Sequence, residues 1–144
     1  MNRSIARRLM LLPLLLAACS VWPTQEDIER SLDEQLRSVT GSWIARANDG
    51  SLALDFQLTE NSSAQVTGSG TMQERGAAGT LPVTLTGSYQ RPVLTLAVEG
   101  MRYEGRAVRG TFRGSYTTVG GIGDTLVLVG DGYTKRLPML LQER

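Results

Sequence analysis

The side chains that could perform chemistry in this chain are few. The sequence contains no histidine, a single cysteine, Cys19, and a single lysine, Lys135. Histidine is the commonest general base and metal ligand near neutral pH, so both roles would fall to other side chains. A nucleophilic mechanism would need a serine beside Lys135, and acid–base chemistry would need paired carboxylates such as Glu99 and Glu104. Neither arrangement lies in a recognisable motif, so we expect no enzyme, no metal ion and no cofactor.

Arginines form the densest basic run of the chain. The run consists of Arg102, Arg106, Arg109 and Arg113. Their even spacing in two expected strands would place each pair on one face of its strand. Guanidinium groups match the geometry of phosphate and carboxylate, so the run could bind an anion such as a lipid headgroup or a polymer. The simpler interpretation is a solvated outer face whose charge is balanced by Glu99 and Glu104.

The single cysteine follows a short apolar segment at the start of the chain. Residues 1–18 contain Arg3, Arg7 and Arg8, no acidic residue, and then an apolar run over residues 9–18. A basic region followed by an apolar run is typical of a secretory signal peptide. The run has about ten residues, half of the roughly 20 that a helix needs to cross a bilayer core. We therefore expect residues 1–18 to be a removable leader.

The residues around the cysteine resemble a known processing signal. Leu16-Ala17-Ala18-Cys19 looks like the lipobox of bacterial lipoproteins. The resemblance implies that the Cys19 sulfur receives a diacylglyceryl group, that a peptidase cuts before Cys19, and that the new amino terminus is acylated, for example with palmitate. In lipoproteins, a serine such as Ser20 after the cysteine is the usual signal for transport to the outer membrane.

A lipobox of this kind predicts where the protein works. Two or more acyl chains give stable membrane anchoring. We therefore expect a cell-envelope protein anchored through Cys19, on the periplasmic face of the outer membrane, with residues 19–23 as the lipidated tether. With Cys19 lipidated, the mature chain has no other thiol for a disulfide.

Composition limits the remaining possibilities. Removal of residues 1–18 takes away three of the fifteen basic residues and none of the fourteen acidic ones, which leaves a net charge of −2. Bulk charge therefore gives no support for binding nucleic acid. The mature chain has the length of one domain.

A short amphipathic helix is expected over residues 24–39. Apolar residues recur at helical spacing at Ile28, Leu32, Leu36 and Val39. Thr24 and Asp27 have the spacing of a capping box. The polar face is acidic, the wrong sign for anionic lipid. We expect the apolar stripe to pack on the following domain.

From residue 40 to residue 144 the sequence alternates between apolar and polar residues, with frequent turn signals. Nine segments have the pattern of strands: 42–47, 51–59, 63–74, 80–90, 92–99, 102–108, 111–118, 124–130 and 133–141. Turns are expected between them, among others at Asn48-Asp49-Gly50, Glu99-Gly100 and Arg109-Gly110. Short loops between antiparallel strands favour an all-β fold, an up-and-down antiparallel β-barrel of about eight strands. Pro138 lacks an N–H, so the ninth segment could lie outside the ring as an edge strand.

The start of this region resembles a known barrel opening. Gly41-Ser42-Trp43 is similar to the Gly-x-Trp opening of lipocalins and avidins. The resemblance implies a small lipocalin-like or calycin-like barrel in which Trp43 plugs one end against an arginine, here Arg144 or Arg136. Avidins bind biotin with several further tryptophans, and this chain has none after Trp43. Biotin binding is therefore not expected.

The barrel interior could hold a ligand or be filled by side chains, since eight-stranded barrels allow both. The residues expected to line a pocket are Leu54, Phe56, Leu85, Tyr89, Phe112 and Tyr116. The first hypothesis for function is an envelope lipoprotein whose barrel binds a small hydrophobic ligand or an envelope protein partner. The alternative is a non-catalytic structural or assembly-accessory lipoprotein with a filled barrel.

Overall fold

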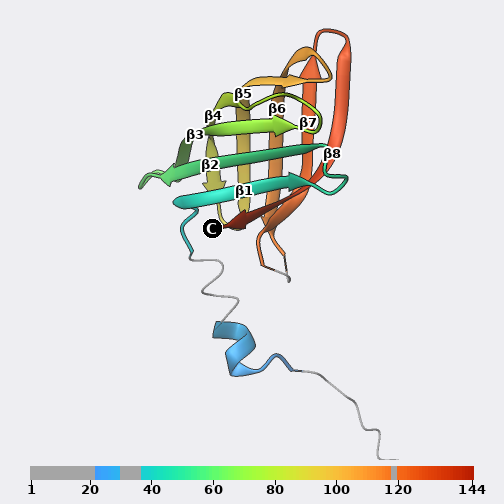
Figure 1. The fold of residues 1–144 in the computed structure, drawn as a ribbon. Coiled ribbons are helices and arrows are strands. Elements are labelled where there is room, and N and C mark those ends of the chain that lie inside the picture. The colour runs from blue at the N-terminus through green and yellow to red at the C-terminus, as the bar shows by residue number, and fades with distance from the viewer. Residues whose placement is uncertain (1–21, 30–36, 118–119) are drawn as a thin grey trace, which may run out of the picture.

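Eight antiparallel strands form a closed barrel in the computed structural model of the chain (Figure 1). The structure describes residues 22–29, 37–117 and 120–144. The strands are β1 (Gly41–Ala47), β2 (Leu52–Glu60), β3 (Gln65–Glu74), β4 (Leu81–Gln90), β5 (Val93–Tyr103), β6 (Arg106–Tyr116), β7 (Ile122–Gly130) and β8 (Tyr133–Glu143). Each strand pairs with the next one in the sequence, and β1 pairs with β8. The predicted all-β, up-and-down barrel is confirmed.

The predicted division into nine strand segments was wrong between residues 92 and 118. The three segments expected there form two long strands, β5 and β6. Glu99-Gly100 is a register irregularity inside β5, and Arg109-Gly110 lies within β6. The chain turns instead at Glu104-Gly105, where both residues have a positive φ, 50° and 74°. Two consecutive residues with positive φ are what a tight hairpin turn requires.

The expectation that the last segment could lie outside the ring was also wrong. Strand β8 pairs with both β1 and β7 and closes the barrel. Pro138 is tolerated because the ladder between β1 and β8 ends beside it, at Ala47 and Met139. Beyond that pair, the Pro138 carbonyl accepts a hydrogen bond from the Asn48 N–H at 2.8 Å, a bond that needs no donor on the proline.

The helix predicted over residues 24–39 is confirmed in part. Residues 25–29 are helical, and the Asp27 N–H donates to the Thr24 hydroxyl at 3.2 Å while the Thr24 N–H donates to the Asp27 carboxylate at 3.1 Å. Residues 30–36 lie outside the described part of the chain. Residues 37–40 are not helical, because Val39 is buried against the barrel instead of continuing an apolar stripe. No helix among the described residues is long and apolar enough to cross a membrane.

The core of the molecule is the barrel interior. In β2, Leu52, Leu54, Phe56 and Leu58 are buried, as their alternation predicts. None of the buried residues in the described part of the chain is polar or charged. Outward positions are mostly polar, and some form rows across strands, such as Thr59 beside Thr67 and Thr67 beside Thr86. The barrel thus has an apolar inside and a polar outside.

Candidate functional site

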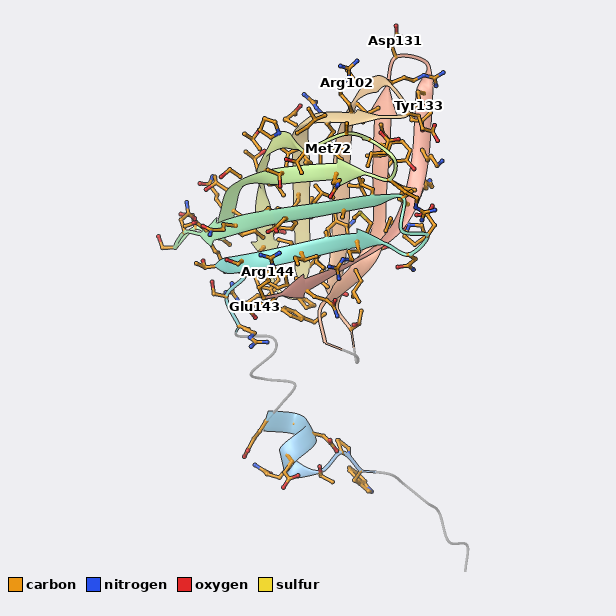
Figure 2. All side chains as sticks on the ribbon, viewed as in Figure 1. Met72, Arg102, Asp131, Tyr133, Glu143 and Arg144 are labelled. Atoms are coloured by element: carbon orange, nitrogen blue, oxygen red, sulfur yellow. The ribbon has the colours of Figure 1, made fainter. Side chains whose placement is uncertain are left out.

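The barrel has two ends that carry different loops. The chain enters from the N-terminal side at one end, called here the tether end, which also carries the loops 61–64 and 91–92, Thr117, residues 120–121 and the C-terminus. The opposite end, called the far end, carries the loops 48–51, 75–80, 104–105 and 131–132. Figure 2 shows Glu143 and Arg144 near the tether end and Arg102, Asp131 and Tyr133 at the far end.

The barrel interior contains a small cavity among the described residues. Leu54, Phe56, Leu85 and Phe112, four of the six residues predicted to line a pocket, surround it, together with other apolar side chains. Its volume is about 20 Å³, whereas pockets for small molecules measure roughly 300–1,000 Å³. An apolar space of this size stays dry. The side chains predicted to hold a ligand therefore fill the barrel.

The two predicted tyrosines lie away from this cavity. Tyr116 is partly buried and packs against the core. Tyr89 is fully buried, and its hydroxyl forms no hydrogen bond with any described residue. Burial raises the pKa of Tyr89, although the Arg91 guanidinium, 4.7 Å from the ring centroid, acts in the opposite direction. Tyr89 is therefore part of the packing near the tether end and not part of a ligand site.

Trp43 closes the tether end, as the Gly-x-Trp resemblance implies, but its partner differs from the expected arginine. The Trp43 side chain is buried, and its indole N–H donates to the carbonyl of Val39 at 2.8 Å. Arg144 instead pairs with Asp55 on the outer face, with 2.7 Å between nitrogen and oxygen. Arg136 also faces outward, so neither arginine packs on Trp43.

Glu60 fastens residues 37–40, called here the strap, across the tether end. Its carboxylate accepts hydrogen bonds from the Ser38 hydroxyl at 2.9 Å and from the Val39 N–H at 3.2 Å. The same carboxylate pairs with Arg91 at 2.8 Å, and the side chain is 7% exposed. The Glu60 N–H in turn donates to the Thr40 hydroxyl at 2.9 Å. One side chain thus joins the strap, the end of β2 and the loop between β4 and β5.

The environment of Glu60 changes its pKa. Burial alone would raise the pKa, but the hydrogen bonds from Arg91, Ser38 and Val39 outweigh burial and hold it below its ordinary value of 4.5. A carboxylate with a lowered pKa in the folded state stabilises the fold above its unfolded-state pKa. This stabilisation disappears as the pH falls through the lowered pKa.

Glu60→Gln is therefore expected to lower the free energy of unfolding at pH 7 by about 2 kcal/mol, because hydrogen bonds to a charged group are lost and Arg91 loses its counterion. The variant is also expected to lose less stability than the wild type between neutral pH and about pH 3, since the titrating group is gone. Urea unfolding monitored by circular dichroism at both pH values measures both effects.

Glu99→Gln is the matched control for this prediction. Glu99 pairs with Arg109 at 2.7 Å, but the two side chains are 45% and 66% exposed. An exposed pair contributes at most about 1 kcal/mol. Equal losses in the two variants at pH 7 would contradict a specific role for Glu60.

A second polar cluster lies at the far end around Glu104. The Tyr133 hydroxyl donates to the Glu104 carboxylate at 2.7 Å, and the Lys135 ammonium donates to it at 3.1 Å. These hydrogen bonds, first from Tyr133 and then from Lys135, lower the pKa of Glu104. The hydrogen bond to Glu104 raises the pKa of Lys135. Lys135 is thus a protonated lysine engaged with a carboxylate.

This cluster bears on the catalytic pairs considered from the sequence. The hydrogen-bond partner of Lys135 is Glu104 and not a serine. Glu99 pairs with Arg109, and Glu104 pairs with Lys135, so each of the two carboxylates has its own cation. Among the described residues, no group of three or more potential ligands could hold a metal ion.

The four arginines of the basic run do not form one site. Arg109 and Arg113 share the outer face of β6, as predicted. Arg102 and Arg106 were expected in one strand but lie on either side of the Glu104-Gly105 turn, which places Arg106 over the Tyr133 ring at 4.9 Å from its centroid. Figure 2 shows Arg102 at the far end of the barrel.

Sequence reasoning missed the contact between Val39 and Glu60 at the tether end. Val39 has the spacing of a helix stripe, and Glu60 directly follows the segment 51–59 expected to be a strand, so neither pattern points to the other. Cys19, the predicted lipidation site, lies outside the described residues.

Comparison with protein-family models, with curated proteins and with solved structures finds no match to this chain. The closed eight-stranded antiparallel barrel is consistent with the small lipocalin-like barrel implied by Gly41-Ser42-Trp43.

Proposed function

We propose that this protein is a lipid-anchored bacterial envelope protein whose filled β-barrel is a non-catalytic structural or assembly module. The observation that carries the proposal is the size of the interior cavity, about 20 Å³ with an apolar lining. A carrier of hydrophobic molecules needs a space at least ten times larger, roughly 300 Å³ or more. The outer surface of the barrel is thus the part that would meet an envelope protein partner.

The arrangement of the tether end supports anchoring through Cys19. The strap leaves the barrel at this end and is held there by Glu60 and Trp43. An acyl anchor at Cys19 would therefore turn the tether end toward the membrane and the far end away from it. In this proposal the membrane is the outer membrane, and the barrel lies on its periplasmic face.

Non-catalytic action is part of the same proposal. Lys135, Glu99 and Glu104 are the groups from which a catalytic pair could have been built, and each is tied in an ion pair. The proposal therefore assigns the function to binding surfaces of the barrel.

The proposal is tested by mass spectrometry of the full-length protein expressed in a bacterium that has an outer membrane and purified from membranes in detergent. We expect a denatured mass equal to the chain from Cys19 plus two or three acyl chains. Under native conditions we expect no additional hydrophobic molecule inside the barrel. The Cys19→Ser variant is expected to carry no acyl mass and to leave the membrane fraction, whereas Ser20→Ala is expected to remain acylated.

Two outcomes would overturn separate parts of the proposal. An unacylated wild type, or a Cys19→Ser variant that fractionates with membranes as the wild type does, would exclude the lipid anchor. A hydrophobic molecule that co-purifies in a fixed ratio would show that the barrel opens to hold a ligand, and would restore the carrier hypothesis.

A further inference from the structure

An open pocket lies at the far end of the barrel, between the loop 75–80 and the hairpin of β5 and β6. Its volume is about 310 Å³, within the range of roughly 300–1,000 Å³ for small-molecule sites. Met72, which is buried, and Leu81, which is 38% exposed, give it apolar contact surface. Ala77, Ala78 and Gly79 are small residues that leave the space open.

Two opposite charges line the same pocket without pairing. These are the carboxylate of Glu74 and the guanidinium of Arg102. Among the described residues, the Arg102 side chain forms neither a hydrogen bond nor an ion pair, and the Glu74 side chain forms no ion pair. Opposite charges beside an apolar surface complement a ligand that carries both charges itself.

The frame of the pocket is held in place by hydrogen bonds. Oε1 of Glu74 accepts the Glu104 N–H at 2.9 Å, which joins the end of β3 to the hairpin of β5 and β6. Glu104 is held in turn by Tyr133 and Lys135 of β8. This leaves Oε2 of Glu74 for a ligand. A site that is already ordered loses less conformational entropy on binding.

We propose that this pocket binds a small zwitterion with an apolar side chain, of the chemical class of an amino acid or a short peptide. The planar guanidinium of Arg102 receives the ligand carboxylate. Glu74 receives the ammonium group, and the thioether of Met72 and the side chain of Leu81 contact the apolar side chain. An anion without an ammonium group would leave the Glu74 charge uncompensated. This inference does not depend on the lipid anchor or on the filled interior.

Calorimetric titration of the full-length protein with L-leucine tests the proposal. We expect a dissociation constant of about 1 mM or lower. N-acetyl-L-leucine lacks the ammonium group and L-leucinamide lacks the carboxylate, so each is expected to bind about tenfold more weakly. L-leucyl-L-leucine distinguishes the two sources of the zwitterion: tighter binding of the dipeptide indicates a peptide ligand, and tighter binding of leucine indicates a free amino acid.

Variants of the pocket test which charged group of the ligand Arg102 and Glu74 each bind. Arg102→Gln is expected to weaken binding of leucine and of N-acetyl-L-leucine alike. Glu74→Gln keeps an oxygen for the Glu104 N–H and is expected to weaken binding of leucine about tenfold. It is not expected to weaken binding of N-acetyl-L-leucine, because that ligand has no ammonium group to pair with Glu74. Arg113→Gln, on the outer face of β6, is the matched control and is expected to bind as the wild type does.

The proposal is overturned if neither leucine nor the dipeptide binds at about 10 mM, a concentration well above the expected dissociation constant. It is also overturned if the wild type binds leucine, N-acetyl-L-leucine and leucinamide equally, or if Arg113→Gln lowers affinity as much as Arg102→Gln does.

Discussion

Gly87→Ala is expected to lower the free energy of unfolding by about 3 kcal/mol, and the melting temperature by more than about 10 °C. Gly87 lies in β4 opposite Leu96 of β5. A Cβ at this position would stand 1.9 Å from the carbonyl oxygen of Thr95 and 2.8 Å from its carbonyl carbon. These atoms belong to the backbone of the neighbouring strand, so the two strands would have to move apart. Thermal unfolding followed by circular dichroism measures the loss.

Gly76→Ala is the control that separates this clash from the general effect of adding a methyl group to glycine. Gly76 has a φ of 82° but no atom within 4 Å of an added Cβ. The variant is therefore expected to lose only the conformational cost of a positive φ, about 1 kcal/mol. If Gly76→Ala lost as much stability as Gly87→Ala, close approach of the strands would not be the reason for glycine in β4.

Much of the fold was predictable because local signals agree with it. The alternation of β2 assigns its inward residues correctly, since the side-chain period of a strand is two. The first hairpin turns where Asn48-Asp49-Gly50 predicts, and Gly50 has the positive φ of 70° that such a turn uses. Polar outward positions and short loops were enough to indicate a closed up-and-down barrel.

The boundary between β5 and β6 was not predictable from local signals. Glu99-Gly100, Glu104-Gly105 and Arg109-Gly110 are three charged residue–glycine pairs spaced five residues apart. Contacts between residues that are distant in the sequence determine at which of these three pairs the chain turns. Glu104 is held by Tyr133 and Lys135, which are 29 and 31 residues away. A turn at Glu104 brings these groups together. The local sequence pattern, in contrast, is the same at all three glycines.

The candidate sites were less predictable than the fold for a similar reason. Sequence alternation identifies which side chains face inward, but the volume left between them depends on how they pack. Four of the residues predicted to line a pocket do surround the interior cavity, and yet the space among them measures only about 20 Å³. The pocket at the far end is lined by Glu74 of β3 and Arg102 of β5, two strands that are not neighbours. No local sequence pattern joins these two residues.

Trp43→Ala is expected to lower the free energy of unfolding by about 3–5 kcal/mol, the usual cost of deleting a large buried aromatic side chain. Trp43 is 1% exposed, and its indole N–H is the donor to the Val39 carbonyl. The substitution therefore creates a cavity at the tether end and leaves a buried carbonyl without its donor. Urea unfolding followed by circular dichroism measures the loss, with Trp22→Ala as the matched control. Trp22 is 78% exposed, so its removal is expected to change stability by less than about 0.5 kcal/mol.

The Trp43→Ala variant also separates the contributions of Trp43 and Glu60 to holding the strap. Trp43 holds it through the Val39 carbonyl, and Glu60 holds it through Ser38 and the Val39 N–H. Trp43→Phe keeps most of the apolar volume and removes only the indole N–H, at a cost of about 1 kcal/mol. Amide hydrogen exchange at Val39 is expected to quicken in Trp43→Ala, because the Val39 carbonyl loses its hydrogen bond from the indole N–H. Unchanged protection of Val39 in Trp43→Ala, together with lost protection in Glu60→Gln, would show that the carboxylate alone fastens the strap and that Trp43 only fills the end of the barrel.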